Sequence, residues 1–270
     1  MPYSILPFSP SRVLKRAGSA LRYRLRSRRE YARLDALPRY QPTTTAVLGT
    51  PLDLPDARSF LEMHYDIFER ESYRFETEEA EPYIIDGGAN IGLSVLYFKA
   101  LHPRSRVVAF EPDPAIFAYL ERNVRRSGAE RVALVPKALA AAEARRAFVE
   151  EGSYGSRLAR PGGAENSAVE TVRLRPYLYS RVALLKLDIE GAEAEVLADC
   201  ADLLPNVERV ALEYHSFADE PQTLHVILSV LAEAGFRVHV NEVRTAPQPL
   251  VHRDVIAGMD LQLLVTAFRP

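Results

Sequence analysis

A glycine-rich turn is the first feature of the sequence that could do chemistry. The apolar run Tyr83-Ile84-Ile85 leads into Asp86-Gly87-Gly88, and Gly92 follows where a helix is expected to begin. Glycine permits a tight turn and a close approach of backbone to a ligand, while the free N–H groups of a helix start favour electron-rich atoms. The spacing Asp-x-Gly-x-x-x-Gly differs from the Gly-x-Gly-x-x-Gly loop that receives a pyrophosphate. It therefore disfavours NAD as the ligand.

A carboxylate follows the next expected strand. Glu111 stands about 20 residues beyond the glycine loop, where an acidic side chain can accept hydrogen bonds from two ribose hydroxyls. Glu111 alone does not separate NAD from S-adenosylmethionine, but together with the Asp86 loop and the apparent closing hairpin of the sheet it favours S-adenosylmethionine. The alternative without a ligand is a glycine turn at an ordinary strand end beside a surface glutamate.

A second group of acids follows two later strands. Asp188 and Glu190 come after the apolar run 182–187, and period-two alternation puts Glu213 and His215 on one face near the end of the following strand. The carboxyl ends of parallel strands bind ligands, so we expect these side chains to converge there. Helix capping is the alternative for the acids, and it is the preferred interpretation of Glu193.

Methyl transfer to an alcohol is an in-line displacement in which the acceptor must also lose a proton. His215 is the predicted general base because an imidazole has an ordinary pKa near 6.5, and Glu213 is the alternative base. Asp188 would contact the donor's methionine end or the substrate. Since a lone histidine is often structural, a structural role for His215 stays open. Asp188, Glu190, Glu213 and His215 are also candidate ligands of a hard divalent ion.

Strands and helices alternate from Pro82 onward, which predicts a parallel sheet with crossover helices. We expect two closing strands to form a hairpin with one antiparallel member. Asp113 followed by Pro114 is a strong helix start. Residues 140–171 are predicted to leave the sheet and to include short strands near Phe148 and Val169. The expected strands are 83–86, 106–111, 131–136, 182–188, 207–214, 236–240 and 261–268, and the expected helices are 57–75, one after Asn90, one from Pro114, one from Gly191 and 222–234.

The N-terminal part has a different composition. Residues 12–29 hold eight basic side chains and no acidic one, with a narrow apolar stripe at Leu14, Ala17, Leu21 and Leu25. The pattern predicts a basic amphipathic helix, which would either contact an anionic membrane surface or pack on a partner or on the domain. We therefore expect residues 1–50 to form an extension and connector, and residues 51–270 to form the catalytic domain.

Overall composition limits the partners. The formal net charge is -2 and the isoelectric point is about 6.3, so no nucleic-acid partner is expected. Cys200 is the single cysteine and no apolar run is long enough for a membrane span, which predicts a cytoplasmic protein, at most peripheral to a membrane.

With these motifs in view, the chain resembles the FkbM family of methyltransferases over about residues 51–270. The resemblance rests on four stretches: Tyr-Asp-Ile-Phe at 65–68 with Tyr73, Ile-Asp-Gly-Gly-Ala-Asn-Ile-Gly at 85–92, Ala-Phe-Glu-Pro at 109–112, and Leu-Lys-Leu-Asp-Ile-Glu-Gly-Ala-Glu at 185–193. It implies an α/β, Rossmann-like class I fold with a seven-stranded, mostly parallel sheet, an antiparallel last strand and helices on both faces. It also implies O-methylation of hydroxyls on sugars, polyketides and other natural products.

The resemblance further suggests a ligand-binding role for several positions. Asp86, Gly88 and Asn90 would line the methionine part of S-adenosylmethionine, with Gly92 completing the loop, and Glu111 would bind the ribose. Ala138 and Leu139 would approach the adenine, although Lys137 stands where the family often carries asparagine before Ala-Leu.

The leading hypothesis is an S-adenosylmethionine-dependent O-methyltransferase acting on a hydroxyl of a sugar, a glycan or glycolipid, or another natural product. No Asn/Asp-Pro-Pro-Tyr motif of amino-group methylases follows the fourth strand, and Cys200 lacks the context of a cysteine-dependent base methylase. The alternatives are an NAD-dependent oxidoreductase or epimerase and a non-catalytic module that binds S-adenosylmethionine. The acceptor and the oligomeric state stay open.

Overall fold

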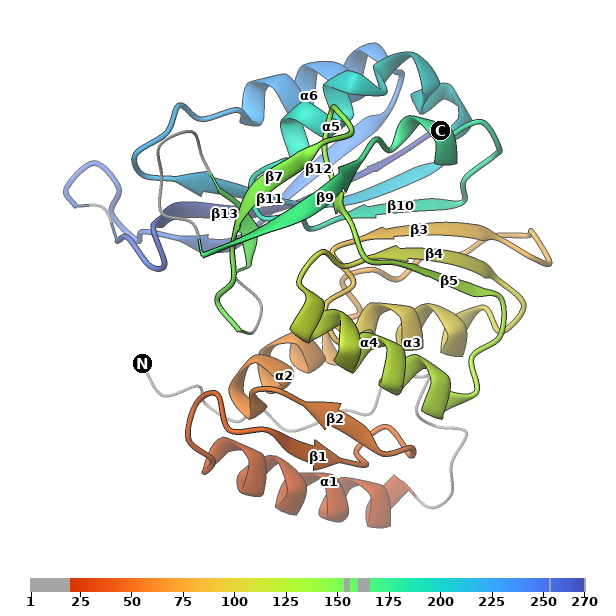
Figure 1. The fold of residues 1–270 in the computed structure, drawn as a ribbon, viewed down its shortest axis with the longest axis vertical. Coiled ribbons are helices and arrows are strands. Elements are labelled where there is room, and N and C mark those ends of the chain that lie inside the picture. The colour runs from red at the N-terminus through yellow and green to blue at the C-terminus, as the bar shows by residue number, and fades with distance from the viewer. Residues whose placement is uncertain (1–19, 153–155, 160–165, 253, 270) are drawn as a thin grey trace.

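The computed structural model describes residues 20–152, 156–159, 166–252 and 254–269, with side chains from Arg28 onward. Its centre is a seven-stranded sheet in the order β12-β13-β11-β10-β3-β4-β5 (Figure 1). The strands are β3 (Tyr83–Gly87), β4 (Arg106–Phe110), β5 (Val132–Val135), β10 (Leu184–Leu187), β11 (Arg209–Phe217), β12 (Arg237–Thr245) and β13 (Met259–Phe268). β13 is antiparallel to both of its neighbours and the other pairs are parallel. The predicted fold class is confirmed.

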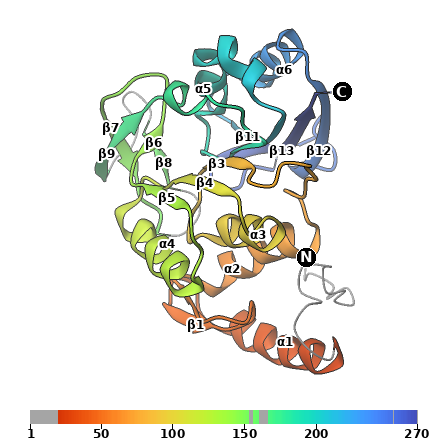
Figure 2. The same cartoon turned by 90° about the vertical axis from the view of Figure 1, so that its right-hand side faces the viewer.

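Helices cover both faces of this sheet. α3 (Leu93–Leu101) and α4 (Pro114–Ser127) lie on one face, and α5 (Glu193–Asp199) and α6 (Leu224–Glu233) lie on the other (Figures 1 and 2). α4 begins as predicted, because the Asp113 carboxylate accepts hydrogen bonds from the N–H groups of Ala115 and Ile116. It ends at Gly128, which adopts a left-handed conformation with φ 71°.

The core has two halves that the sheet separates. Successive residues of β3 point to opposite faces, so Ile84 packs in the half that includes α3 and α4 while Ile85 packs in the half that includes α5 and α6. Every residue of β10 is buried. The apolar runs of the central strands therefore reflect burial on both faces, as expected for a parallel sheet with helices on each side.

The segment between β5 and β10 forms a small sheet of its own. Its strands are β6 (Ala138–Leu139), β7 (Arg145–Val149), β8 (Arg157–Leu158) and β9 (Ser167–Val172), in the order β6-β9-β7-β8. The predicted short strands near Phe148 and Val169 are confirmed as β7 and β9. Phe148, Val169 and Ala138 form a separate small core beneath this excursion.

The N-terminal part packs below α3 and α4. α1 (Ala20–Asp35) continues beyond the predicted basic segment, of which residues 12–19 lie outside the described residues. β1 (Thr43–Thr45) and β2 (Leu52–Leu54) form an antiparallel hairpin, and Leu34, Leu52 and Leu54 are buried in the same core half as Ile84. The expected domain boundary after residue 50 falls in the connection of this hairpin, and the division at that point stays a prediction.

Several element lengths differ from the sequence predictions, and the strand expected over 236–240 is β12, which extends to Thr245. The helix expected over 57–75 is shorter: α2 (Ala57–His64) passes into a π-helical turn, η2 (Tyr65–Glu69), which ends two residues before Glu71 takes φ 54°. β11 is longer than expected and reaches Phe217, because β13 pairs with it along its whole length. Glu213 and His215 consequently lie inside the strand instead of at its end.

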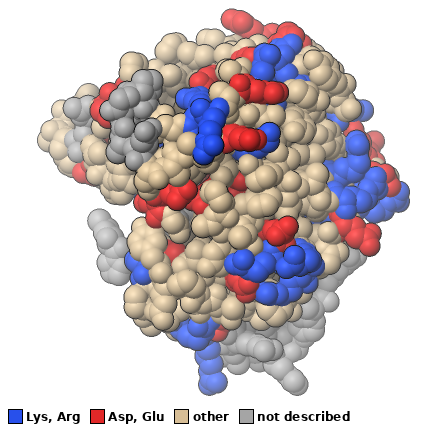
Figure 3. Space-filling view, in the orientation of Figure 1, with Lys and Arg blue, Asp and Glu red and all other residues tan. Residues whose placement is uncertain are grey.

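Surface charges are mixed in sign. On the face drawn in Figure 3, basic and acidic side chains lie side by side in small groups. The ion pairs of the described residues follow the same pattern: Arg122 and Arg126 both pair with Asp53, and Arg104 and Arg131 both pair with Glu81. In the part of the chain that the structure describes, no helix combines the length and the apolar character needed to cross a membrane.

Candidate functional site

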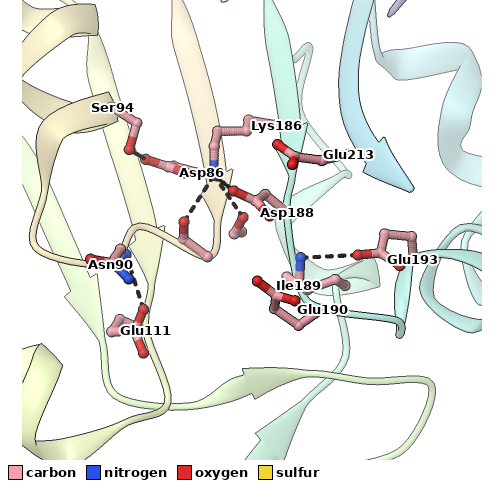
Figure 4. Close-up of polar contacts among 12 residues, drawn as sticks. Asp86, Asn90, Ser94, Glu111, Lys186, Asp188, Ile189, Glu190, Glu193 and Glu213 are labelled. Carbon is pink, nitrogen blue, oxygen red and sulfur yellow. Dashed lines mark hydrogen bonds and ion pairs between the residues drawn. The ribbon is translucent and has the colours of Figure 1, made fainter. Parts of the chain in front are cut away.

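The predicted residues meet at the edge of the sheet formed by the carboxyl ends of its parallel strands. The glycine loop follows β3, Glu111 follows β4, Asp188 follows β10, and Glu213 projects from β11 (Figure 4). Strands that are distant in sequence are neighbours here because β3 lies between β4 and β10. The structure thus brings the two predicted groups of residues together, with the loop on one side and the acids on the other.

The glycine loop is shaped by close backbone contacts. Gly88 and Ala89 both donate backbone hydrogen bonds to the carbonyl of Phe110, at 3.0 and 2.9 Å. A Cβ atom at Gly88 would lie 1.8 Å from the carbonyl oxygen of Asp188, and Gly88 also has φ 81°. Only glycine fits this contact between the loop and β10.

The other positions of the loop have different roles. Asn90 has φ 48°, and its side chain accepts a hydrogen bond from the backbone N–H of Ile91 at 2.8 Å. Gly92, with φ 96°, begins α3 at a point where a Cβ would lie 2.9 Å from the Leu120 side chain. The structure therefore assigns Gly92 to the packing of α3 against α4.

Glu111 is held by the loop and by the start of α4. Its Oε2 accepts a hydrogen bond from the backbone N–H of Asn90, and its Oε1 accepts one from the N–H of Asp113, both at 2.9 Å. Burial raises the pKa of Glu111 to about 8, although these two backbone donors act in the opposite direction. Because each carboxylate oxygen has further acceptor capacity, the side chain can still receive the hydroxyls of a diol.

Asp86 lies beneath the loop instead of on its surface. The side chain is fully buried, and it accepts a hydrogen bond from the hydroxyl of Ser94 at 2.5 Å. Its other oxygen is 3.0 Å from the ammonium nitrogen of Lys186. In this conformation Asp86 supports the loop from inside.

Lys186 is a residue of the site for which the sequence analysis predicted no role. It is buried on β10, and its Nζ donates hydrogen bonds to the carbonyls of Gly88 at 2.8 Å and Gly87 at 3.2 Å. Burial alone would lower the pKa of Lys186, but the carboxylates of Asp86 and Asp188 outweigh it and the pKa is raised. The available signal was a charged residue inside the apolar run 184–187.

The acids on the other side of the loop surround His215. Its Nδ1 lies 3.0 Å from Oε1 of Glu193. Its Nε2 faces Asp188, Glu190 and Glu213, at 3.8, 3.7 and 3.8 Å from the nearest carboxylate oxygen. These three distances are too long for hydrogen bonds, so the side chains lie near one another without direct contact between their polar atoms.

Two neighbouring residues complete this cluster. Gln262 on β13 approaches both Glu213 and His215, and its amide nitrogen lies 3.3 Å from Nε2 of His215. Glu193 also accepts hydrogen bonds from the backbone N–H groups of Ile189 and Gly191 at 3.2 and 3.0 Å, so it holds the turn before α5. Glu193 therefore links this turn to the imidazole.

The electrostatics of the cluster bear on the choice of base. Burial by itself would lower the pKa of His215, but the surrounding carboxylates, Glu190 first, raise it well above its ordinary value. Burial also raises the pKa of Glu190 and of Glu213. A protonated imidazole has no free lone pair for a substrate proton, so this environment favours Glu213 over His215 as the proton acceptor.

Three side chains of the cluster lie close enough together to hold a metal ion. One ligand atom each from Asp188, Glu213 and His215 lies within 4.8 Å of the other two. Glu190, the fourth predicted ligand, approaches the same imidazole nitrogen at 3.7 Å. Mixed carboxylate and imidazole ligands suit several divalent ions.

The predicted adenine-side residues lie on the excursion. Ala138 and Leu139 form β6, are buried, and pair with β9. The Leu139 side chain packs directly beside Gly87, because a Cβ at Gly87 would lie 2.8 Å from it. Lys137 projects away and forms an ion pair with Glu170 at 2.8 Å. The adenine role of Ala138 and Leu139 stays a prediction.

Comparisons with known proteins agree with this architecture. Residues 86–238 match the model of the methyltransferase FkbM domain. Methyltransferase sdnD of Sordaria araneosa is 31% identical over 226 residues, covering 68% of this chain and 85% of that protein. The 31-O-demethyl-FK506 methyltransferase FkbM of Streptomyces tacrolimicus is 29% identical over 214 residues, covering 65% and 81%.

A solved structure agrees at the level of the fold. The crystal structure of methyltransferase FkbM from Methylobacillus flagellatus KT matches with a TM-score of 0.50 and 16% identity, covering 74% of this chain. The match spans 47% of that longer chain. The family match covers more than half of the present sequence and includes both the glycine loop and the acidic cluster, so this chain belongs to the FkbM methyltransferase family.

Proposed function

We propose that this protein transfers a methyl group from S-adenosylmethionine to a hydroxyl oxygen of a sugar, a glycan or glycolipid, or another natural product. The observation that carries the proposal is that Glu111 and the Gly88 loop share one sheet edge with Asp188 and Glu213. The first pair suits a ribose-containing donor, and the second suits an acceptor that must lose a proton.

The chemistry assigns separate tasks to the two sides. S-adenosylmethionine supplies an electrophilic methyl group on a sulfonium. When bound, it would supply this methyl carbon to the acceptor oxygen, with a C–O bond forming as the C–S bond breaks, and the hydroxyl proton would pass to a base. Glu213 is the proposed base. His215 is enclosed by carboxylates, and it orients these side chains and balances their charge. Glu111 binds the ribose hydroxyls through its remaining acceptor positions.

The relatives support the acceptor class. The name of the Streptomyces tacrolimicus protein describes methylation of 31-O-demethyl-FK506, and its prefix indicates that the methyl group is added to an oxygen. For the present chain the acceptor is inferred from this relationship and from the acids beside the donor loop.

The proposal is tested first on the donor and then on the acceptor. S-adenosylmethionine and S-adenosylhomocysteine are expected to raise the melting temperature of the protein, whereas NAD is not. Labelled donor incubated with a panel of hydroxylated metabolites should then yield a methyl ether, identified by mass spectrometry. Stabilisation by NAD alone would support the oxidoreductase alternative. Donor binding with no transfer to any hydroxyl would support a non-catalytic module.

A divalent ion is a second candidate feature of the same reaction. As an alternative to Glu213 acting as the base, we propose an ion held by Asp188, Glu213 and His215, whose ligand atoms converge within 4.8 Å. Binding of the ion would displace the proton from Nε2 of His215. Glu193 already fixes Nδ1 of the imidazole, an arrangement that commonly orients a metal-binding histidine. Such an ion would bind the acceptor hydroxyl and lower its pKa.

Ion binding is measured by thermal melting of chelator-treated protein with Mg²⁺ or Mn²⁺. The ion should raise the melting temperature of wild type but not of Asp188→Asn. Asp254→Asn is the matched control, since Asp254 lies 3.6 Å from His252 in an exposed pair of the same residue types. Equal responses of wild type and Asp188→Asn would exclude the ion from this cluster.

A further inference from the structure

A buried ammonium group connects the donor loop to the acidic cluster. Lys186 lies on β10, between the loop that follows β3 and the side chain of Asp188 (Figure 4). We propose that Lys186 is a positioning residue for methyl transfer, which holds Gly87 and Gly88 in the donor-binding conformation and turns Asp188 toward the acceptor. This inference rests on the proposed donor site.

The first step of the argument concerns the backbone of the loop. Lys186 donates hydrogen bonds to the carbonyls of Gly88 and Gly87, while the N–H of Gly88 donates to the carbonyl of Phe110. Each of the two peptide groups that flank Gly88 is thus held at both ends: Lys186 of β10 binds its carbonyl, and the Phe110 carbonyl of β4 accepts its N–H. Two residues later, the N–H of Asn90 meets Glu111. The ammonium therefore helps to fix the path along which the loop reaches the ribose-binding carboxylate.

The second step concerns the charge of Asp86. This carboxylate is fully buried, and its other partner, the hydroxyl of Ser94, is neutral. A buried ionised group is tolerated only when it is paired and hydrogen-bonded, and Lys186 provides the pairing at 3.0 Å. Since Asp86 faces inward, its influence on the donor passes through the lysine and the loop.

The third step concerns the two oxygens of Asp188. Oδ2 lies 3.7 Å from the ammonium nitrogen of Lys186, and Oδ1 lies 3.8 Å from Nε2 of His215. Attraction of one oxygen to the lysine leaves the other directed at the imidazole. Asp188 is also partly exposed, so without this attraction its side chain would be free to rotate. Lys186 thereby sets the geometry on both sides of the transferred methyl group.

The test measures donor affinity and thermal stability in the whole protein by calorimetry and melting. Lys186→Met should weaken S-adenosylhomocysteine binding about tenfold, the loss expected for charged hydrogen bonds. Lys186→Gln should recover part of that loss, because its amide can still donate to the loop carbonyls. The matched control is Lys99→Met, which removes another ammonium-to-carbonyl bond, the 2.7 Å contact with Ser105, away from the loop. Lys99→Met should leave donor affinity unchanged.

A second pair of variants covers the case in which Lys186→Met does not fold. Asp86→Asn/Lys186→Met removes both members of the buried ion pair, and its donor affinity is compared with that of Asp86→Asn alone. A weaker affinity in the double variant supports the positioning role, and equal affinities overturn it. Wild-type-like affinity in a folded Lys186→Met also overturns it. If wild type itself binds no donor, the proposed function fails, which is a different result from either of these.

Discussion

The two sides of the site are built differently. On the proposed donor side, Asp86, Glu111 and Lys186 make contacts of 2.5 to 3.2 Å with backbone groups, with the Ser94 hydroxyl or with one another. On the acceptor side, Nε2 of His215 is 3.7 to 3.8 Å from three carboxylates, and like charges accumulate there. The polar groups on the donor side satisfy one another. The acceptor side instead concentrates negative charge, which a proton, a cation or a substrate group would balance. Substitutions on the donor side should therefore change binding, and substitutions on the acceptor side should change turnover.

The largest effect is expected at Gly88. Gly88→Ala places a Cβ 1.8 Å from the carbonyl oxygen of Asp188, so the loop must separate from β10 and donor binding should be lost, with a marked fall in melting temperature. Gly128→Ala is the control, because Gly128 has a similar φ of 71° but nothing within 4 Å of its Cβ position. It should cost only about 1 to 2 kcal/mol of backbone strain. Retained donor binding in Gly88→Ala would show that the donor side is not rigid.

The next largest effect is expected on turnover at the acceptor side. Glu213→Gln removes the proposed base and should slow methyl transfer by about 10² to 10⁴-fold. His215→Ala should also lower turnover, because it removes the group around which the carboxylates are arranged. Both should leave donor affinity near wild type in calorimetry.

The control for the histidine is His225→Ala, on the exposed face of α6. Wild-type turnover in His215→Ala would remove the imidazole from the reaction. A loss of donor affinity in either acceptor-side variant would contradict the division of the site into two sides.

A smaller effect is expected at Glu111. Glu111→Ala removes the carboxyl group that the donor ribose would contact and should weaken donor binding by about 10- to 100-fold, equivalent to one or two hydrogen bonds. Titration calorimetry measures the change, with Glu121→Ala on the exposed surface of α4 as the control. Unchanged affinity would exclude Glu111 from the donor site.

The last prediction concerns the pH dependence of stability instead of binding or turnover. Burial raises the pKa of Glu111 from 4.5 to about 8, so the folded protein holds a proton there that the unfolded chain releases. This bound proton stabilises the folded protein fully below about pH 4.5, and the stabilisation is lost as the pH rises toward 8. Glu111→Gln should reduce the slope across this window by at most about 1.4 kcal/mol per pH unit. Identical slopes in denaturant titrations of the two proteins would contradict the raised pKa.

The fold could largely be predicted because its signals are local. Apolar runs ending in glycine or acid gave the central strands, and Asp113 with Pro114 gave the start of α4. Element lengths were less predictable, since they depend on distant partners. β11 extends to Phe217 because β13 pairs with it, and α2 stops early because its chain passes into a π-helical turn.

Most of the residues that converge in the candidate site could be predicted from the sequence, but Lys186, Gln262 and the contacts of the site could not. Alternation along β11 correctly grouped Glu213 with His215, and the strand ends correctly placed Asp188 nearby. The sequence does not reveal that Asp86 faces inward, because that depends on Lys186 and Ser94. Nor does it reveal the number of carboxylates around His215, which determines how well the imidazole could act as a base.

The position of β13 has a consequence for how the protein is assembled. β12 is the edge strand of the sheet and joins it through β13, which lies between β12 and β11. During synthesis β12 therefore emerges before the strand that attaches it, and the late segment must insert between two earlier ones. β13 also carries Gln262 to the side of His215. The surroundings of His215 are therefore complete only when the last strand has joined the sheet, whereas the contacts of Glu111 with Asn90 and Asp113 involve no residue of β13.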